Sequence, residues 1–498
     1  MHMHVLKDYD IPIEDLTRYT VGYGLHQHVE SIEDARKEVY VEIKTLKDCC
    51  MLLGTGTEEK VKMHDLVCDV AIQIASSIEH GFMVKAGVGL KEWPRNTKSF
   101  EGCKTISLMG NKLAELPEEL VCPQLKVLLL ELDDDLKVPE RFFEGMKEIE
   151  VLSLKGGCLS LQSLEFSTKL KSLLLIWCKC NDLIWLRKLQ RLEILGFIGC
   201  YSVTELPDEI GELKELRLLD VTGCGSLGRI PANLIGRLKK LEELLFGGCN
   251  FKGWGDSTGG TNASLTELNL LSHLAVLSLE IRGVECIPRD FVFPRLLKYD
   301  IMLGDEYTYT NALWKVYTNI IEHPARLYLH DISAASLNAK IFEQLFPTVS
   351  QIRFIDVEGL ENIALSCDQM TSHGHGSQND FFQRLEDVFV YRCRDIRTLF
   401  PAKWRQALNN LTSVEIYGCE SLEEVFELGE TGEGINEEKE LLSSLTRLHL
   451  GNLPELKCIW KGAHCTCRPP KSCSSGSCGV FTSRHLSSHR TRLKVLFI

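Results

Sequence analysis

The sequence predicts a solenoid of stacked parallel strands, and two observations support this prediction. An L-x-x-L-x-L pattern of apolar residues returns every 21 to 36 residues between Cys103 and Leu450. In six copies a cysteine stands three residues after the last apolar position, as Cys224 does after Val221. This repeat length and this cysteine position are typical of a leucine-rich repeat, in which each unit contributes one strand to a curved sheet.

About 14 copies of the pattern lie between residues 91 and 460, and we assign this range to the repeat domain. One repeat cannot bury its leucine side chains alone, so neighbouring repeats must stack and share a continuous core. The cysteines of the pattern fit this core as small apolar side chains that can also hydrogen-bond the turn. They are Cys178, Cys200, Cys224, Cys249, Cys393 and Cys419.

The composition is that of an ordinary water-soluble protein, with 498 residues of which 44% are hydrophobic and 25% are charged. The chain contains 20 cysteines, but its start lacks the apolar segment of a signal peptide, and no apolar run reaches the ~18 residues that cross a membrane. We therefore expect reduced thiols, a cytoplasmic location and no transmembrane segment. The net charge of -13 argues against nucleic acid as a general partner.

Residues 1–90 lack the leucine pattern and predict a small module that precedes the repeats. A first helix is expected at Pro12, because the first helical turn tolerates proline. Ser31 can cap a second helix, in which apolar residues recur at i, i+4 and i+7. The apolar positions of this second helix are Val39, Ile43 and Leu46.

A hairpin follows these helices, with strands expected at residues 51–53 and 60–63, and a third helix is expected from Asp65 to Ala75. Helices followed by a hairpin suggest a winged-helix arrangement. The predicted fold class is therefore an α/β solenoid, a leucine-rich-repeat horseshoe with a parallel concave sheet, preceded by a small winged-helix-like α+β module.

One string of the module resembles a known family. Val61-Lys-Met-His-Asp-Leu-Val-Cys-Asp-Val-Ala-Ile-Gln-Ile-Ala75 is similar to the Met-His-Asp segment of plant intracellular disease-resistance proteins, the nucleotide-binding, leucine-rich-repeat family. Residues 9–16 and 31–36 resemble the stretch that leads to this motif, particularly in the coiled-coil class. Together with the repeats, the resemblance covers about residues 5–460, and it implies the C-terminal part of such a protein.

The resemblance also implies a role for three residues of the motif. Met63, His64 and Asp65 would belong to the last subdomain of the NB-ARC switch, which binds ADP or ATP. His64 would face the β-phosphate of bound ADP, and an imidazole suits this role because it can donate a hydrogen bond to phosphate. The alternative is that His64 is merely a polar residue between a strand and a helix.

A nucleotide switch also needs a phosphate-binding loop of the form G-x-x-x-x-G-K-[ST]. The chain contains no Gly-Lys dipeptide, and the short GxG strings at Gly22 and Gly54 are weak signals. We therefore expect no tight binding of ADP or ATP by this chain alone. Because the first helix of the module looks cut, we expect a truncated product whose nucleotide-binding domain acts from an upstream segment or in trans.

A protein partner is expected on the concave face of the sheet. Side chains alternate along a strand, so the residues beside the apolar anchors point to this face. Exposed aromatic groups flanked by carboxylates are plausible binding anchors. The alternative for Tyr391 and Tyr417 is that they stabilise the sheet as neighbours on adjacent strands. Stacking the repeats predicts that Leu218 and Asp220 lie beside Glu243 and Leu245, and that Phe389 and Tyr391 lie beside Glu415 and Tyr417. The candidate partner-binding residues are Leu218, Asp220, Glu243, Leu245, Asp387, Phe389, Tyr391, Glu415 and Tyr417.

Residues 461–498 form an irregular tail that is rich in cysteine and serine. It has enough cysteines to ligate zinc, but they lack the paired C-x₂₋₄-C spacing of a common zinc site. The composition suits a flexible segment, so we predict no metal site. The cysteines are Cys465, Cys467, Cys473 and Cys478, and the apolar residues Leu493, Leu496 and Ile498 echo one more strand.

These observations predict a plant immune receptor, or the sensor half of one. Its repeats would recognise a pathogen effector or a modified, guarded host protein and trigger a defence response. Recognition would relieve the contact between the repeats and the switch module and let ATP replace ADP, provided that a phosphate-binding loop exists upstream. The alternative is a repeat scaffold or adaptor that binds protein without switching. We expect no enzyme, because neither G-x-S-x-G nor H-E-x-x-H occurs.

Overall fold

The chain divides into two compact units, Met1–Leu274 and Ala275–Ile498. The computed structural model describes residues 10–26, 28–75, 81–94, 100–180, 182–249, 251, 253–254, 261–304, 325–337, 339–363, 381–429, 444–462 and 494–497.

The first unit begins with a module of three helices and a small sheet. Strand β3 pairs antiparallel with both β1 and β2, so the predicted hairpin is present. Ser31 caps the second helix as predicted, because its Oγ accepts a hydrogen bond from the Asp34 backbone N–H at 3.1 Å. The winged-helix assignment of this module stays a prediction. Its elements are β1 (Ile11–Pro12), α1 (Ile13–Tyr23), α2 (Ile32–Asp48), β2 (Leu52–Gly54), β3 (Lys60–Met63) and α3 (Asp65–Ala75).

A small apolar core holds this module together. It joins Ile13 of α1, Val39 and Ile43 of α2, and residues of the hairpin. The prediction that Leu46 continues the apolar stripe of α2 is wrong, because Leu46 is 38% exposed. The buried cluster ends at Ile43, one helical turn earlier, so nothing in it reaches the last turn of α2.

The repeat strands of the first unit pair in parallel and in sequence order. Short 3-10 helices occupy many of the returning segments, such as Gln162–Phe166 and Asp208–Glu212. The strands are β4 (Phe82–Val84), β5 (Thr105–Leu113), β6 (Val127–Leu132), β7 (Val151–Lys155), β9 (Ser172–Ile176), β11 (Ile194–Ile198), β12 (Leu218–Asp220) and β13 (Glu243–Leu245), with β8 (Cys158–Leu159) and β10 (Lys179–Cys180) pairing as a separate ribbon.

The second unit continues the same architecture, so the predicted solenoid with a parallel sheet is confirmed. Its main sheet contains β14 (Val276–Ile281), β15 (Lys298–Leu303), β16 (Ala325–His330), β17 (Gln351–Ile355), β18 (Asp387–Tyr391), β20 (Ser413–Tyr417), β22 (Arg447–Gly451) and β24 (Lys494–Phe497), and a second sheet contains β19 (Thr398–Phe400), β21 (Glu424–Gly429) and β23 (Cys458–Gly462). The four cysteines of the predicted tail lie outside the described residues, and β24 is the strand that the last apolar residues predicted.

The pattern cysteines of the first unit join their repeats to the preceding ones. The Cys224 thiol donates to the Phe197 carbonyl at 2.8 Å, and the Cys249 thiol donates to the Val221 carbonyl at 2.9 Å. Burial raises the pKa of Cys224 to about 12, so this thiol keeps its proton near neutral pH. The cysteines therefore serve as buried hydrogen-bond donors, as the sequence predicted. Among the described residues, no helix is long and apolar enough to cross a membrane.

We expect Cys224→Ala to lower the free energy of unfolding by about 1–3 kcal/mol, because it removes a buried hydrogen bond and leaves the Phe197 carbonyl unpaired. Urea denaturation followed by circular dichroism measures this change. Cys49→Ala is the matched control, since Cys49 is exposed. Equal stability of the two variants would contradict the role given to the buried thiol.

Candidate functional site

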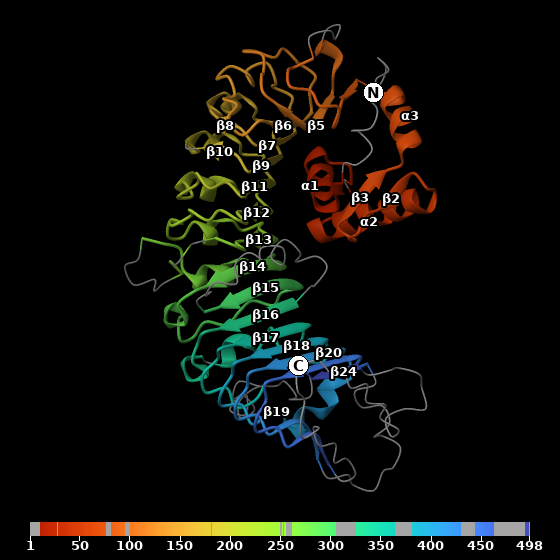
Figure 1. Cartoon of the computed structure of the whole chain (residues 1–498). Coiled ribbons are helices and arrows are strands. Elements are labelled where there is room, and N and C mark those ends of the chain that lie inside the picture. Colours follow the sequence, from red (N-terminus) through yellow and green to blue (C-terminus); the bar gives the residue numbers. More distant parts are fainter. Residues whose placement is uncertain are drawn as a thin grey trace. The chain divides into compact units, whose positions relative to one another are not determined.

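Helices α1 and α2 lie against the concave face of the first unit (Figure 1). Their apolar contact joins Ile32 of α2 to Leu174, Ile194 and Leu218 of three neighbouring strands. Tyr19 of α1 packs at the edge of this cluster and places its hydroxyl 3.1 Å from the Ser153 Oγ. The N-terminal module of the chain thus covers the concave face of these strands, the face that points away from the core of the repeats.

Gly22 allows α1 to approach the sheet closely. A Cβ at this position would stand 2.4 Å from the Ser172 Cβ and 3.1 Å from the Val151 Cγ2. Any larger residue would therefore push α1 away from β7 and β9. The weak GxG signal at Gly22 reflects this packing, and Gly24 ends the helix in the left-handed region with φ 71.

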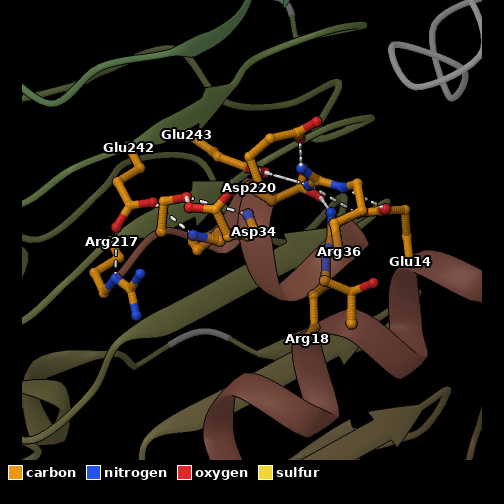
Figure 2. Close-up of polar contacts among 12 residues, drawn as sticks. Glu14, Arg18, Asp34, Arg36, Arg217, Asp220, Glu242 and Glu243 are labelled. Atoms are coloured by element: carbon orange, nitrogen blue, oxygen red, sulfur yellow. Dashed lines mark hydrogen bonds and ion pairs between the residues drawn. The ribbon is translucent and has the colours of Figure 1, made fainter. Parts of the chain in front are cut away.

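The centre of the interface is the guanidinium of Arg36, whose side chain is only 4% exposed. Its Nη2 donates to both carboxylate oxygens of Glu243, at 2.8 and 3.0 Å. Its Nε donates to Glu14 at 2.7 Å, and its Nη1 contacts Glu33. Figure 2 shows Arg36 between Glu14 and Glu243. Burial opposes the charged form of Arg36, but the carboxylates of Glu243 and Glu14 outweigh it and raise its pKa above the ordinary value.

Two further contacts extend this network (Figure 2). The Arg18 Nη2 of α1 donates to the Asp220 Oδ2 of β12 at 2.7 Å, and both side chains are buried. Glu242 accepts from the Arg217 Nε at 2.6 Å and from the Ile32 backbone N–H at 2.7 Å. The second bond places a carboxylate at the N-terminus of α2, where the helix dipole favours negative charge.

Four of the predicted partner-binding residues belong to this interface or lie beside it. The strand register predicted from the repeats is correct, since Leu218 pairs with Glu243 and Asp220 pairs with Leu245. All four side chains are buried in this conformation, and three of them contact α1 or α2. Sequence reasoning missed Arg18 and Arg36 as their partners. The sequence did contain a signal for this contact, because Arg18 and Arg36 of the predicted helices have charges opposite to those of Asp220 and Glu243 on the concave face.

The three residues of the Met-His-Asp motif take separate positions. His64 caps α3, because its Nδ1 accepts a hydrogen bond from the Leu66 backbone N–H at 3.2 Å. The neutral imidazole then carries its proton on Nε2. Met63 lines a cavity of ≈ 330 Å³ between the module and β4–β6. Asp65 begins α3, and its side chain lies outside the described residues.

This arrangement offers little to a nucleotide. The cavity beside Met63 is walled mainly by apolar side chains such as Leu16, Met109 and Leu129, which do not suit phosphate groups. Of the described side chains in the motif, only that of His64 can donate to a phosphate oxygen. In the part of the chain that the structure describes, no group of His, Cys, Asp and Glu side chains could hold a metal ion.

The remaining predicted residues form a half-buried row on the concave face of the second unit. Phe389 pairs with Glu415 and Tyr391 pairs with Tyr417 in the strand register, as predicted. The ring centroid of Phe389 lies 6.4 Å from that of Tyr391 and 6.1 Å from that of Tyr417. The Glu415 carboxylate lies 3.8 Å from the His449 Nδ1. Aromatic contact in this row therefore runs through Phe389, and Asp387 stands at the start of the same strand.

Arg353 is the residue of this row that sequence reasoning missed. Its Cζ lies 5.5 Å from the ring centroid of Tyr328 and 5.6 Å from that of Phe389. The strand register explains this arrangement, because Tyr328, Arg353 and Phe389 are direct neighbours on three adjacent strands. Aligning the repeats would have revealed an arginine between two aromatic positions.

These features define a leucine-rich-repeat protein with a covered and an aromatic part of its concave face. Residues 353–467 match the family model described as plant disease resistance protein RPS2-like, leucine-rich repeats. Disease resistance protein At4g27190 of Arabidopsis thaliana is 27% identical, with 91% of this chain and 51% of the relative covered. Disease resistance protein RPS5 of the same plant is also 27% identical, with 93% and 46% covered.

The comparisons confirm the resemblance that the sequence indicated, to plant disease resistance proteins with leucine-rich repeats. The chain spans about half the length of the curated relatives it matches. Among solved structures, the functional domain of InlJ from Listeria monocytogenes is 12% identical to this chain, with a TM-score of 0.42. The match covers 72% of this chain and 63% of the InlJ chain.

We expect Arg36→Ala to release the module from the repeats. Removing one partner of a buried ion pair costs about 3–5 kcal/mol, because the remaining charges stay buried and unpaired. Hydrogen exchange of the α1 and α2 amides should therefore become roughly a hundredfold to a thousandfold faster. Arg141→Ala is the control, since Arg141 pairs with Glu119 and Glu144 on the exposed surface. Equal exchange in both variants would show that the network does not hold the module.

Proposed function

We propose that the chain is the sensor part of a plant immune receptor, whose repeats bind a protein partner while the N-terminal module rests against them. The buried network around Arg36 carries this proposal, because its ion pairs join helices and strands that lie about 200 residues apart in the sequence. The names of the relatives support a role in disease resistance. The partner would be a pathogen effector or a guarded host protein in the cytoplasm.

Activation requires that the partner bind the open state more tightly than the closed one. Moving such an equilibrium from 1:99 to 99:1 takes a difference of about 5.5 kcal/mol between the two affinities. The network suits a switch of this kind, since Arg18 loses Asp220 and Arg36 loses Glu243 when α1 and α2 leave the sheet. A partly opened interface would leave buried charges unpaired, so closed and open states are favoured over intermediates.

Helix α3 supplies a second contact of the proposed receptor. Leu66, Val70 and Ile74 recur at i, i+4 and i+8 along one face and are 72%, 55% and 58% exposed. An exposed apolar stripe of this length marks a surface that another element covers. We assign this role to a nucleotide-binding domain, supplied upstream or in trans, that holds ADP or ATP. The His64 imidazole at the start of α3 would then donate to the β-phosphate of ADP and favour the resting state.

The second candidate function is a repeat scaffold or adaptor that binds protein without switching. The half-buried aromatic row of the second unit favours it, because this row can bind a partner while the module stays in place. The single phosphate donor in the motif, His64, also agrees with a chain that does not respond to nucleotide.

Expression in plants separates the two functions. If the chain is a receptor part, Arg36→Ala in the gene that encodes it should raise a defence marker in uninfected leaves, because the released module mimics partner binding. Arg141→Ala should leave the marker at the wild-type level. A released module, shown by hydrogen exchange, together with an unchanged marker would support the scaffold and contradict the receptor.

We expect the purified chain to bind ADP no more tightly than the millimolar range, because one imidazole cannot replace a phosphate-binding loop. Isothermal calorimetry with ADP measures this affinity, and His64→Ala should not change it detectably. Micromolar binding that His64→Ala weakens would show that the chain holds a nucleotide site of its own.

A further inference from the structure

We propose that Arg353 and Arg392 on the second unit form a site that binds the carboxylates of an acidic segment of the protein partner. This inference rests on the proposed binding of a partner by the repeats, and it names the chemistry that the partner must present. It does not depend on the release of the N-terminal module.

Arg353 is held in place by aromatic rings and keeps its donors for another group. Its guanidinium lies over the rings of Tyr328 and Phe389, at 5.5 and 5.6 Å. A guanidinium over a ring uses its face, so the N–H groups around its edge stay available. One of them, Nε, is buried and has no hydrogen-bond partner in the structure. A ligand carboxylate would therefore bind the two terminal nitrogens, Nη1 and Nη2, because the buried Nε is inaccessible to an external ligand.

Arg392 adds a second cation at the end of the same strand. Its Cζ lies 5.4 Å from the ring centroid of Tyr391, which itself stacks on Phe389. Arg392 has a φ of 55, in the left-handed region. The equivalent position of the following repeat is Gly418, with a φ of 66. A residue other than glycine in this region costs roughly 1 kcal/mol. Asp331 and Asp356 take the same conformation after the two preceding strands, with φ of 50 and 51, so this turn is a feature of the repeat that places Arg392 directly after Tyr391.

Neither arginine forms an ion pair with any of the residues that the structure describes. Nearby acids are engaged with other groups. Asp300 pairs with the buried Arg326 at 2.6 Å, and Glu415 faces His449. The two guanidinium groups are thus oriented by rings, while their charge is not neutralised by a direct partner.

The surroundings select an acidic protein segment among anionic ligands. A guanidinium edge matches a carboxylate with two parallel hydrogen bonds. The rings of Phe389, Tyr391 and Tyr417 offer apolar surface for a neighbouring side chain of the same segment. Two arginines can neutralise a ligand with two carboxylates, whereas Glu415 in the row and the net charge of -13 disfavour nucleic acid, whose many phosphates exceed these two cations. The expected ligand is a short segment with two carboxylates and one apolar or aromatic side chain.

The test uses the purified full chain and a phage-displayed library of random 12-residue peptides. We expect the selected peptides to be enriched in Asp and Glu beside an aromatic or aliphatic residue. Changing the Asp and Glu of the best peptide to Asn and Gln should weaken its binding, measured by fluorescence anisotropy, by roughly tenfold or more. Selected peptides without acidic residues, or an Asn and Gln version that binds equally well, would overturn the proposal.

Variants of the chain locate the site. Arg353→Ala should weaken binding of the selected peptide by roughly tenfold or more. Arg353→Lys should not restore this binding, because lysine keeps the charge but lacks the planar guanidinium. Arg394→Ala is the matched control, because it removes the same charge. Arg394 is exposed and lies outside the aromatic row. Unchanged binding by Arg353→Lys, or equal loss with Arg394→Ala, would rule out a specific site. Neither result bears on the module, which the Arg36 variant tests separately.

Discussion

No repeat of this chain can bury its leucines without a neighbour, and the rest of the structure depends on the stacking that this constraint imposes. Stacking aligns the strands in parallel and sends every second side chain into the shared core. In repeats of the first unit that carry the pattern cysteine, its thiol then meets the end of the preceding strand, as Cys224 meets Phe197. The other half of the side chains is not needed for the core, so the concave face can carry different chemistry in different repeats.

The chain uses this freedom in two ways. In the first unit, Asp220 and Glu243 neutralise arginines of α1 and α2, and apolar residues around Leu218 complete the contact. Buried charges of this kind contribute little net stability, but separating one partner is costly, so they specify one docked arrangement. In the second unit the same strand positions carry rings and Arg353. The same positions of the repeat thus form an internal contact in the first unit and the proposed recognition surface in the second.

The N-terminal module shows how a motif can have a local role besides its implied one. His64 caps α3 through Nδ1, which by itself explains a histidine between a strand and a helix. The same hydrogen bond fixes the tautomer and directs the remaining proton to Nε2. The local role and the proposed contact with phosphate are therefore compatible. The exposed apolar stripe that begins at Leu66 is the surface to which we assign the second contact of the proposed receptor.

The sequence by itself determined the repeat, the strand register and local features such as the Ser31 cap, because each of these depends on residues within about one repeat of one another. Spacing alone could not show that Leu46 faces solvent, since that depends on where a packed neighbour ends. Only the tertiary structure decided which concave residues are covered. The contact between Arg36 and Glu243 joins residues 207 positions apart, and no local pattern records which distant charge will neutralise a given arginine.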